Sequence, residues 1–214
     1  MITLKAVNKS EAVRYLGGAG VQMNEAMERL LGECEAELLS CAAPKYLYSV
    51  IDLPCDEITM GSAVKKHLAG CQSAALFCAT LGAQVDRLIR VYQIRDMARA
   101  VVLDSLASAA IEQACVMADE EIAAKLPGKY LTFRFSPGYG DYPLELQRII
   151  LQRLDAARKI GLTVSDSMLL TPAKSVTAVM GISDSPIEQK RRGCAVCSLG
   201  KTCKYRKSGE HCGL

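Results

Sequence analysis

The sequence predicts an α+β fold, in which a mixed or antiparallel sheet packs against long helices. Helix-like and strand-like segments follow one another without a regular β-α-β alternation, which argues against a doubly wound sheet. A long helical stretch between residues 84 and 125 is apolar over much of its surface. The chain has 214 residues, of which 50% are hydrophobic and 23% charged. These values are typical of one globular domain with a short appendage.

Four elements are expected before the long helix. They are, in order, a helix at 24–43, a strand at 46–53, a short helix at 62–68 and a strand at 74–80. The first helix has apolar residues at three- and four-residue steps, and Pro44 ends it. The first strand is rich in β-branched and aromatic residues, and the second is a compact apolar run. Ser62 is placed to cap the short helix.

The long helical stretch is expected to break near residues 93–96. Its second half, 101–122, is rich in alanine and apolar almost all round, so we expect it at the centre of the core. The turn Pro127-Gly128 closes the helix. The remaining elements are a strand at 130–135, a helix at 143–159 with Pro143 in its first turn, and strands at 168–170 and 175–182.

The ten cysteines fall into two groups that mark two parts of the chain. Six lie among Ala, Leu and Val, where a free cysteine acts as a small apolar residue. The other four are in residues 187–214, together with seven basic and two acidic residues. This segment has a net charge of +5, which leaves −2 for residues 1–186 of the total of +3. We therefore expect a body at 1–186 and a basic, Cys-rich tail at 187–214.

The tail is expected to bind a metal through Cys194, Cys197, Cys203 and Cys212. Four thiolates suffice for a zinc ion or an iron-sulfur cluster, and two cysteines separated by two residues often begin such a site. Only one such pair is present, so the choice between the two metals stays open, and His211 could replace a cysteine. The nearby basic residues would offset the negative charge of the site. The alternative is a basic tail with free thiols.

Composition also bears on partners and location. Aromatic residues make up 5% of the chain and Trp is absent, so no nucleic-acid partner is expected. The first 18 residues lack the apolar core of a secretory signal, and we expect no apolar span of membrane length. We therefore expect a cytoplasmic protein without a membrane partner. In a reducing compartment, structural disulfides are not expected.

The segment Arg134-Phe-Ser-Pro-Gly-Tyr-Gly-Asp-Tyr-Pro143 is the candidate ligand site. Arg134 could hold a carboxylate with two parallel hydrogen bonds, and amides in the first turn of the helix beginning at Pro143 would attract negative charge. Gly138 would let a ligand approach the backbone closely, and Tyr139 offers a flat face. The pattern is typical of a site for an amino-acid-like or nucleoside ligand. The alternative is a plain strand-turn-helix.

Three blocks of sequence follow one another with a specific order and spacing. They are Arg134-x-x-Pro137-Gly138-Tyr139 followed by Pro143, then Gly161-Leu-Thr-Val-Ser-Asp-Ser-Met168, and then Leu170-Thr-Pro-Ala-Lys-Ser-Val176. Over roughly residues 95 to 183 they resemble the activation (reactivation) domain of cobalamin-dependent methionine synthase. The body looks like a stand-alone version of that domain. The family's later aromatic residues around the ligand have no clear counterpart after Ile182.

The resemblance implies a reactivation protein for a corrinoid. Such a protein binds S-adenosylmethionine and presents it to cobalamin on a partner, where Co(II) is reduced by one electron and remethylated. The implied partner is a corrinoid protein such as a cobalamin-dependent methionine synthase lacking its activation domain, with flavodoxin or ferredoxin as a possible electron donor. The chain would be a methyltransferase-type enzyme only together with this partner.

The resemblance also implies which residues bind the ligand. Arg134 would engage its carboxylate, Glu112 on the long helix a polar or cationic part, and the backbone of Pro137, Gly138 and Tyr139 its adenosine side. No general base is required, so no catalytic residue is expected, and the chain's work would be positioning. His67 is expected to be an exposed helix residue without a catalytic role.

Two other interpretations stay open beside this one. The chain could be an S-adenosylmethionine or corrinoid sensor, or a docking module without its own activity. An ordinary S-adenosylmethionine methyltransferase is disfavoured, because no Gly-rich loop after a first strand occurs near the N-terminus. If the tail holds an iron-sulfur cluster, the cluster could pass the electron that reactivation needs.

Overall fold

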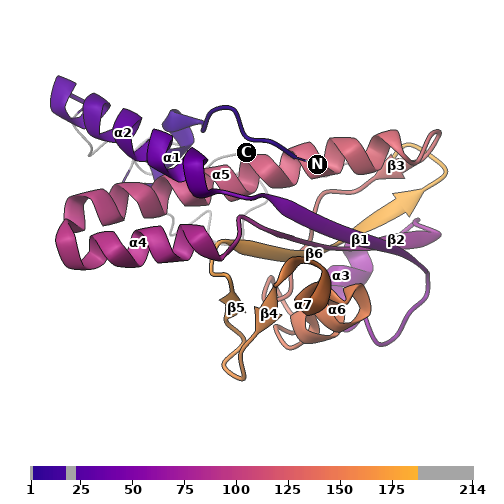
Figure 1. The fold of residues 1–214 in the computed structure, drawn as a ribbon. Coiled ribbons are helices and arrows are strands. Elements are labelled where there is room, and N and C mark those ends of the chain that lie inside the picture. Colours follow the sequence, from indigo (N-terminus) through magenta and orange to yellow (C-terminus); the bar gives the residue numbers. More distant parts are fainter. Residues whose placement is uncertain (1, 18–22, 188–214) are drawn as a thin grey trace, which may run out of the picture.

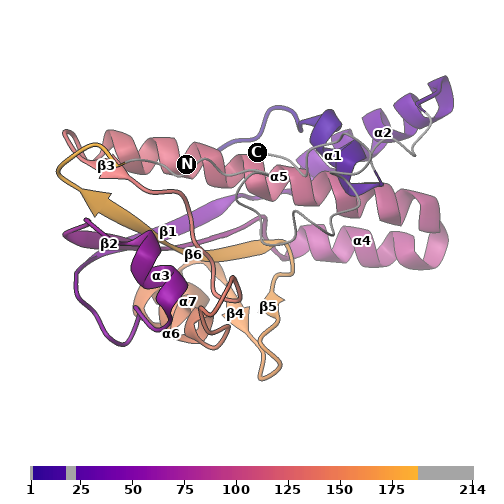
Figure 2. The ribbon, with the colours of Figure 1, turned by 180° about the vertical axis from the view of Figure 1, so that it is seen from behind.

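A four-stranded antiparallel sheet lies between two layers of helices in the computed structural model, which describes residues 2–17 and 23–187 (Figures 1 and 2). The strand order is β1-β2-β6-β3, and β4 and β5 form a separate hairpin. The elements are α1 (Lys9–Tyr15), α2 (Glu25–Cys41), β1 (Lys45–Asp52), α3 (Ser62–His67), β2 (Ser73–Thr80), α4 (Ala83–Arg95), α5 (Met97–Ala124), β3 (Tyr130–Leu131), α6 (Leu146–Leu154), α7 (Ala156–Ile160), β4 (Thr163–Val164), β5 (Leu170–Thr171) and β6 (Ser175–Ser183). The expected α+β class is confirmed.

The two central strands supply side chains to two hydrophobic cores, one on each face of the sheet. Side chains alternate along a strand, so Phe77 of β2 packs in the core with α1, α2, α4 and α5, while Leu76 packs in the core with α3, α6 and α7. Because helices cover both faces, every residue of β2 after Ser73 is buried. This explains why β2 is a continuous apolar run in the sequence.

Helix α5 is the central element of the larger core. The break expected near 93–96 is confirmed at Asp96, whose side chain caps α5 by accepting a hydrogen bond from the Arg99 amide at 3.2 Å. By length and composition α5 is apolar enough to cross a membrane, which the sequence analysis did not expect. Since 61% of that apolar window is buried inside the fold, packing against the body accounts for its composition.

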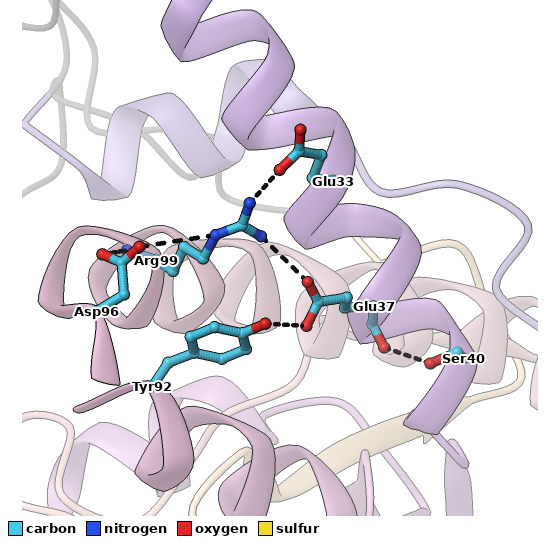
Figure 3. A network of polar contacts seen from close by, with 6 residues as sticks. All are labelled: Glu33, Glu37, Ser40, Tyr92, Asp96 and Arg99. Carbon is cyan, nitrogen blue, oxygen red and sulfur yellow. Dashed lines mark hydrogen bonds and ion pairs between the residues drawn. The ribbon is translucent and has the colours of Figure 1, made fainter. Parts of the chain in front are cut away.

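A polar network joins α2, α4 and α5 at the end of the molecule away from the sheet (Figure 3). Arg99 of α5 donates hydrogen bonds to Glu33 and, at 3.1 Å, to Glu37, both on α2. The Tyr92 hydroxyl of α4 donates to the same Glu37 at 2.7 Å. One arginine and one glutamate therefore fix the packing of three helices. Cys34 lies buried beside them, and burial raises the pKa of its thiol to about 11.

The helix expected at 143–159 is two helices in the structure. α6 begins at Leu146 rather than Pro143, and Asp155 separates it from α7 by adopting the left-handed conformation with φ 54°. The 3.6-residue apolar period continues through this break, because the residues on both sides pack in the same core. The periodicity alone therefore could not reveal the kink.

Four smaller differences concern short elements. The strand expected at 130–135 is regular only at 130–131, and the strand expected at 168–170 lies at 170–171, where it pairs with β4, which was not predicted. Helix α1 was also not predicted. Its start is marked by Asn8, whose side chain accepts a hydrogen bond from the Glu11 amide at 3.3 Å. Seven residues contain too few turns for a periodic signal to stand out.

Candidate functional site

Arg134 lies in a β-bulge at the edge of the sheet. Leu131 pairs with Ile182 of β6, and farther along Phe135 pairs with Val179. Between these pairs, three residues of one strand oppose two of the other, so the edge strand carries one extra residue. Phe133 and Phe135 contact the His67 ring of α3, whereas Arg134 reaches α5 on the opposite face.

On α5, Arg134 meets two carboxylates. Its Nη2 lies 3.2 Å from Glu112 Oε2, and its Nη1 bonds Asp119 Oδ2. Glu112 and Asp119 are seven residues apart, about two helical turns, so they share one face of α5. The Arg134 side chain is only 9% exposed, whereas Glu112 is 51% exposed. The structure thus brings together the predicted Arg134 and Glu112, which are 22 residues apart in the chain.

Asp119 is a site residue that the sequence analysis missed. The signal was available in the spacing, because a residue seven positions after Glu112 must lie on the same side of a helix. The group has one positive and two negative charges, a formal net charge of −1. Cys115 lies buried near these three charges, and burial raises the pKa of its thiol to about 12, so it stays protonated. The arrangement suits a ligand that carries both a carboxylate and a cationic group.

The predicted loop 137–142 is a tight turn held by its own backbone. The Gly138 amide donates to the Tyr142 carbonyl at 2.8 Å, and the Tyr142 amide donates to the Tyr139 carbonyl at 3.0 Å. Gly138 has φ +94°, and a Cβ there would lie 3.3 Å from the Leu144 side chain, so glycine is required. Pro137 is buried, and Tyr139 is 66% exposed, which leaves its flat face available.

Asp141 fastens this loop to α3. Its two carboxylate oxygens accept hydrogen bonds from the amides of Ser62 and Ala63, at 2.6 and 2.8 Å. These bonds favour the charged form and lower the pKa of Asp141 to about 2. The prediction that Ser62 caps α3 is wrong, because Gly61 occupies the cap position and the capping side chain comes from a distant loop.

The amides in the first turn of α6 are engaged by backbone carbonyl groups. Those of Leu146, Gln147 and Arg148 donate to carbonyl groups of the preceding turn, at 3.1 to 3.3 Å. Because the chain forms a tight turn at 143–145 before the helix, these three donors are satisfied locally. An anion site at the amides directly after Pro143 stays a prediction.

His67 was expected to be exposed, but in the structure it is half-buried. The centroid of its ring lies 4.4 Å from the ring centroid of Phe133 and 4.9 Å from that of Phe135. Its Nε2 lies 2.8 Å from the hydroxyl of Thr132, which also accepts a hydrogen bond from the Gly181 amide at 2.7 Å. His67 therefore braces the bulged segment from the face opposite to Arg134.

The predicted metal ligands Cys194, Cys197, Cys203 and Cys212 lie outside the described residues. Within 2–17 and 23–187, no group of three or more His, Cys, Asp or Glu side chains is arranged to hold a metal ion. The six cysteines of the body are free thiols, and Cys34, Cys78 and Cys115 are buried. These three fit the expected role of small apolar core residues.

Two adjoining hollows, of about 270 and 310 Å³, lie around Met97 and Val101, at the end of α5 where it meets α1, α2 and α4. Neither is lined by Arg134, Glu112 or Asp119. The site described above is therefore separate from both hollows.

Among solved structures, the fold is similar to that of the MetH reactivation domain, whose crystal structure has AdoHcy bound. The TM-score is 0.58 at 13% sequence identity, and the match covers 86% of this chain and 76% of that chain. No protein-family model and no curated protein sequence matches the chain. The similarity confirms the reactivation-domain fold that the sequence predicted.

Proposed function

We propose that this chain, which has the fold of the MetH reactivation domain, binds S-adenosylmethionine and takes part in reactivating a protein-bound corrinoid. The observation that carries the proposal is the ion pair between Arg134 and Glu112 beside the Pro137-Gly138-Tyr139 turn. The similar domain binds AdoHcy, which is S-adenosylmethionine without its transferable methyl group.

The site residues match the ligand group by group. The amino-acid end of S-adenosylmethionine carries a carboxylate, which Arg134 can hold, and an ammonium group, which Glu112 can hold. The backbone of Pro137, Gly138 and Tyr139 then lies on the adenosine side. At neutral pH the ligand has a net charge of +1, which complements the −1 of Arg134, Glu112 and Asp119 together.

The ligand supplies an electrophilic methyl group on sulfur, which the partner's corrinoid accepts after one-electron reduction, leaving AdoHcy. The chain's own residues bind and orient the ligand and need no acid or base. The partner is a corrinoid protein, such as a methionine synthase without its own reactivation domain, and flavodoxin or ferredoxin supplies the electron. We place this reaction in the cytoplasm.

Calorimetric titration with S-adenosylmethionine tests the proposal. Arg134→Ala removes a charge-assisted pair with the carboxylate, so we expect the dissociation constant to rise at least about tenfold. Arg158→Ala is the matched control, because Arg158 also pairs with an acid but is 78% exposed on α7. Equal affinities of wild type and Arg134→Ala would contradict the site assignment.

A second measurement separates a reactivation protein from a sensor. Methyl transfer from labelled S-adenosylmethionine to a reduced corrinoid partner is expected only if the chain presents its ligand to that partner. Binding without transfer would favour the sensor or docking module.

We also propose that Cys194, Cys197, Cys203 and Cys212 hold an iron-sulfur cluster or a zinc ion in the tail, 187–214. Support comes from the four thiols and from the basic residues that surround them. A cluster there would relay the electron that reactivation needs.

A further inference from the structure

We infer that Asp119 anchors Arg134, and that the ligand's carboxylate replaces Glu112 on the arginine when the ligand binds. The inference rests on the proposed function and adds a positioning residue to it. The released Glu112 then pairs with the ligand's ammonium group. One internal ion pair is thereby exchanged for two pairs with the ligand.

The two terminal nitrogens of Arg134 are both engaged in the structure. Nη1 bonds Asp119 and Nη2 bonds Glu112 at 3.2 Å. A carboxylate that binds arginine with two parallel hydrogen bonds needs adjacent N–H groups of the same guanidinium. We infer that the ligand's carboxylate takes an edge that includes Nη2, where it competes with Glu112.

Exposure indicates that Glu112 is the acid displaced. The Glu112 side chain is 51% exposed. The Asp119 side chain, on the same guanidinium, is 31% exposed. An exposed pair is weakened by solvent and by the entropy of a long side chain, so it is the cheaper one to break. Asp119 stays and keeps the guanidinium against α5.

The exchange concerns only the amino-acid end of the ligand. S-adenosylmethionine and AdoHcy share this end, with its carboxylate and ammonium group, whereas 5′-methylthioadenosine has the same nucleoside without it. If Asp119 acts through Arg134, its removal must weaken the first two ligands and spare the third. A general loss of folding would weaken all three alike.

The experiment measures dissociation constants of these three ligands for the full chain and its variants. For Asp119→Asn we expect at least about a tenfold increase for S-adenosylmethionine and AdoHcy, and less than about threefold for 5′-methylthioadenosine. Asp119→Glu should recover most of the lost affinity. Glu112→Gln should have a smaller effect than Asp119→Asn, because losing the ammonium contact is partly offset by easier access to Arg134.

Asp104→Asn is the matched control. Asp104 lies on the same helix and also pairs with a basic residue, Lys174 at 2.9 Å, so its removal changes the helix charge by the same amount. Unchanged S-adenosylmethionine affinity in Asp119→Asn, or an equal loss for 5′-methylthioadenosine, would overturn the inference. If wild type binds neither S-adenosylmethionine nor AdoHcy, the proposed function itself fails, and the inference fails with it.

Discussion

Asp141 shows how one side chain links two distant parts of this fold. It belongs to the loop that follows Arg134, yet it caps α3, 78 residues earlier in the chain. Gly61 makes this contact possible, because a Cβ at that position would lie 2.5 Å from the Asp141 carbonyl oxygen. The loop and α3 therefore hold each other in place.

The low pKa of Asp141 predicts a pH-dependent contribution to stability. Its pKa is about 2 in the folded chain, below the ordinary value of 3.8, so the charged carboxylate stabilises the fold. This contribution is complete above about pH 5 and is lost as the pH falls through 3.8 toward 2. We expect Asp141→Asn to unfold at a lower temperature than wild type at pH 7, with the difference narrowing below pH 4.

Thermal unfolding followed by circular dichroism between pH 7 and pH 3 checks this expectation. Asp166→Asn serves as the control, because Asp166 is fully exposed and pairs with Arg148 at 3.3 Å. A difference between wild type and Asp141→Asn that stays constant down to pH 3 would show that the carboxylate's charge is not what stabilises the loop.

At the scale of elements, α5 supplies a larger share of the larger core than any other described helix or strand. Leu103 and Leu106 are completely buried on it, and so are its small residues Ala107, Ala110 and Ala118. These alanines let α1, α2, α4 and the sheet approach the helix closely. Truncation of a large side chain here leaves a cavity that rigid neighbours cannot fill.

Leu106→Ala is therefore expected to lower the free energy of unfolding by about 2 to 5 kcal/mol. Val116→Ala on the same helix is 50% exposed and should change it by less than about 0.5 kcal/mol. Urea unfolding of the three proteins measures both values. Similar values for the two variants would mean that α5 is not the centre of the core.

The elements predicted well are those whose pattern is local. Helix α2, the break at Asp96 and strands β1, β2 and β6 follow from periodicity and composition within a few residues of their observed bounds. The features that were missed depend on contacts between distant residues. The bulge at 133–134 exists only relative to β6, and Asp155 adopts its left-handed conformation within a continuous apolar period.

In the candidate site, too, some residues could be predicted from the sequence, whereas others depend on contacts between distant residues. Arg134 was predicted from its own segment and from the family resemblance, Glu112 from the resemblance alone, and the structure places them in contact. Asp119 is one of several acidic residues on α5, and its contact with Arg134 is seen only in the folded structure. Helix α6 begins three residues later than expected, because sequence spacing cannot distinguish the tight turn at 143–145 from the first turn of a helix.

At the scale of the whole molecule, the chain combines a slightly acidic body with a strongly basic tail. The net charges are −2 for residues 1–186 and +5 for 187–214. The described residues hold three buried thiols and no group of three or more side chains arranged to hold a metal, and the proposed metal site lies in the tail. This separation makes the metal proposal directly testable.

Protein reconstituted anaerobically with iron and sulfide is expected to show iron-dependent absorbance and, after reduction, a spin signal. Replacing Cys194 and Cys197 together by serine should abolish both signals, whereas replacing the buried Cys34 and Cys78 should leave the metal content unchanged. Zinc alone in the purified protein, with neither signal after reconstitution, would exclude the electron relay. No metal of either kind would exclude the tail site.

The alternation of side chains at 133–135 has a consequence for how the candidate site can be redesigned. Arg134 reaches α5, while Phe133 and Phe135 contact His67 on the other face. Residues that face α5 can therefore be substituted while the aromatic packing on the other face stays in place.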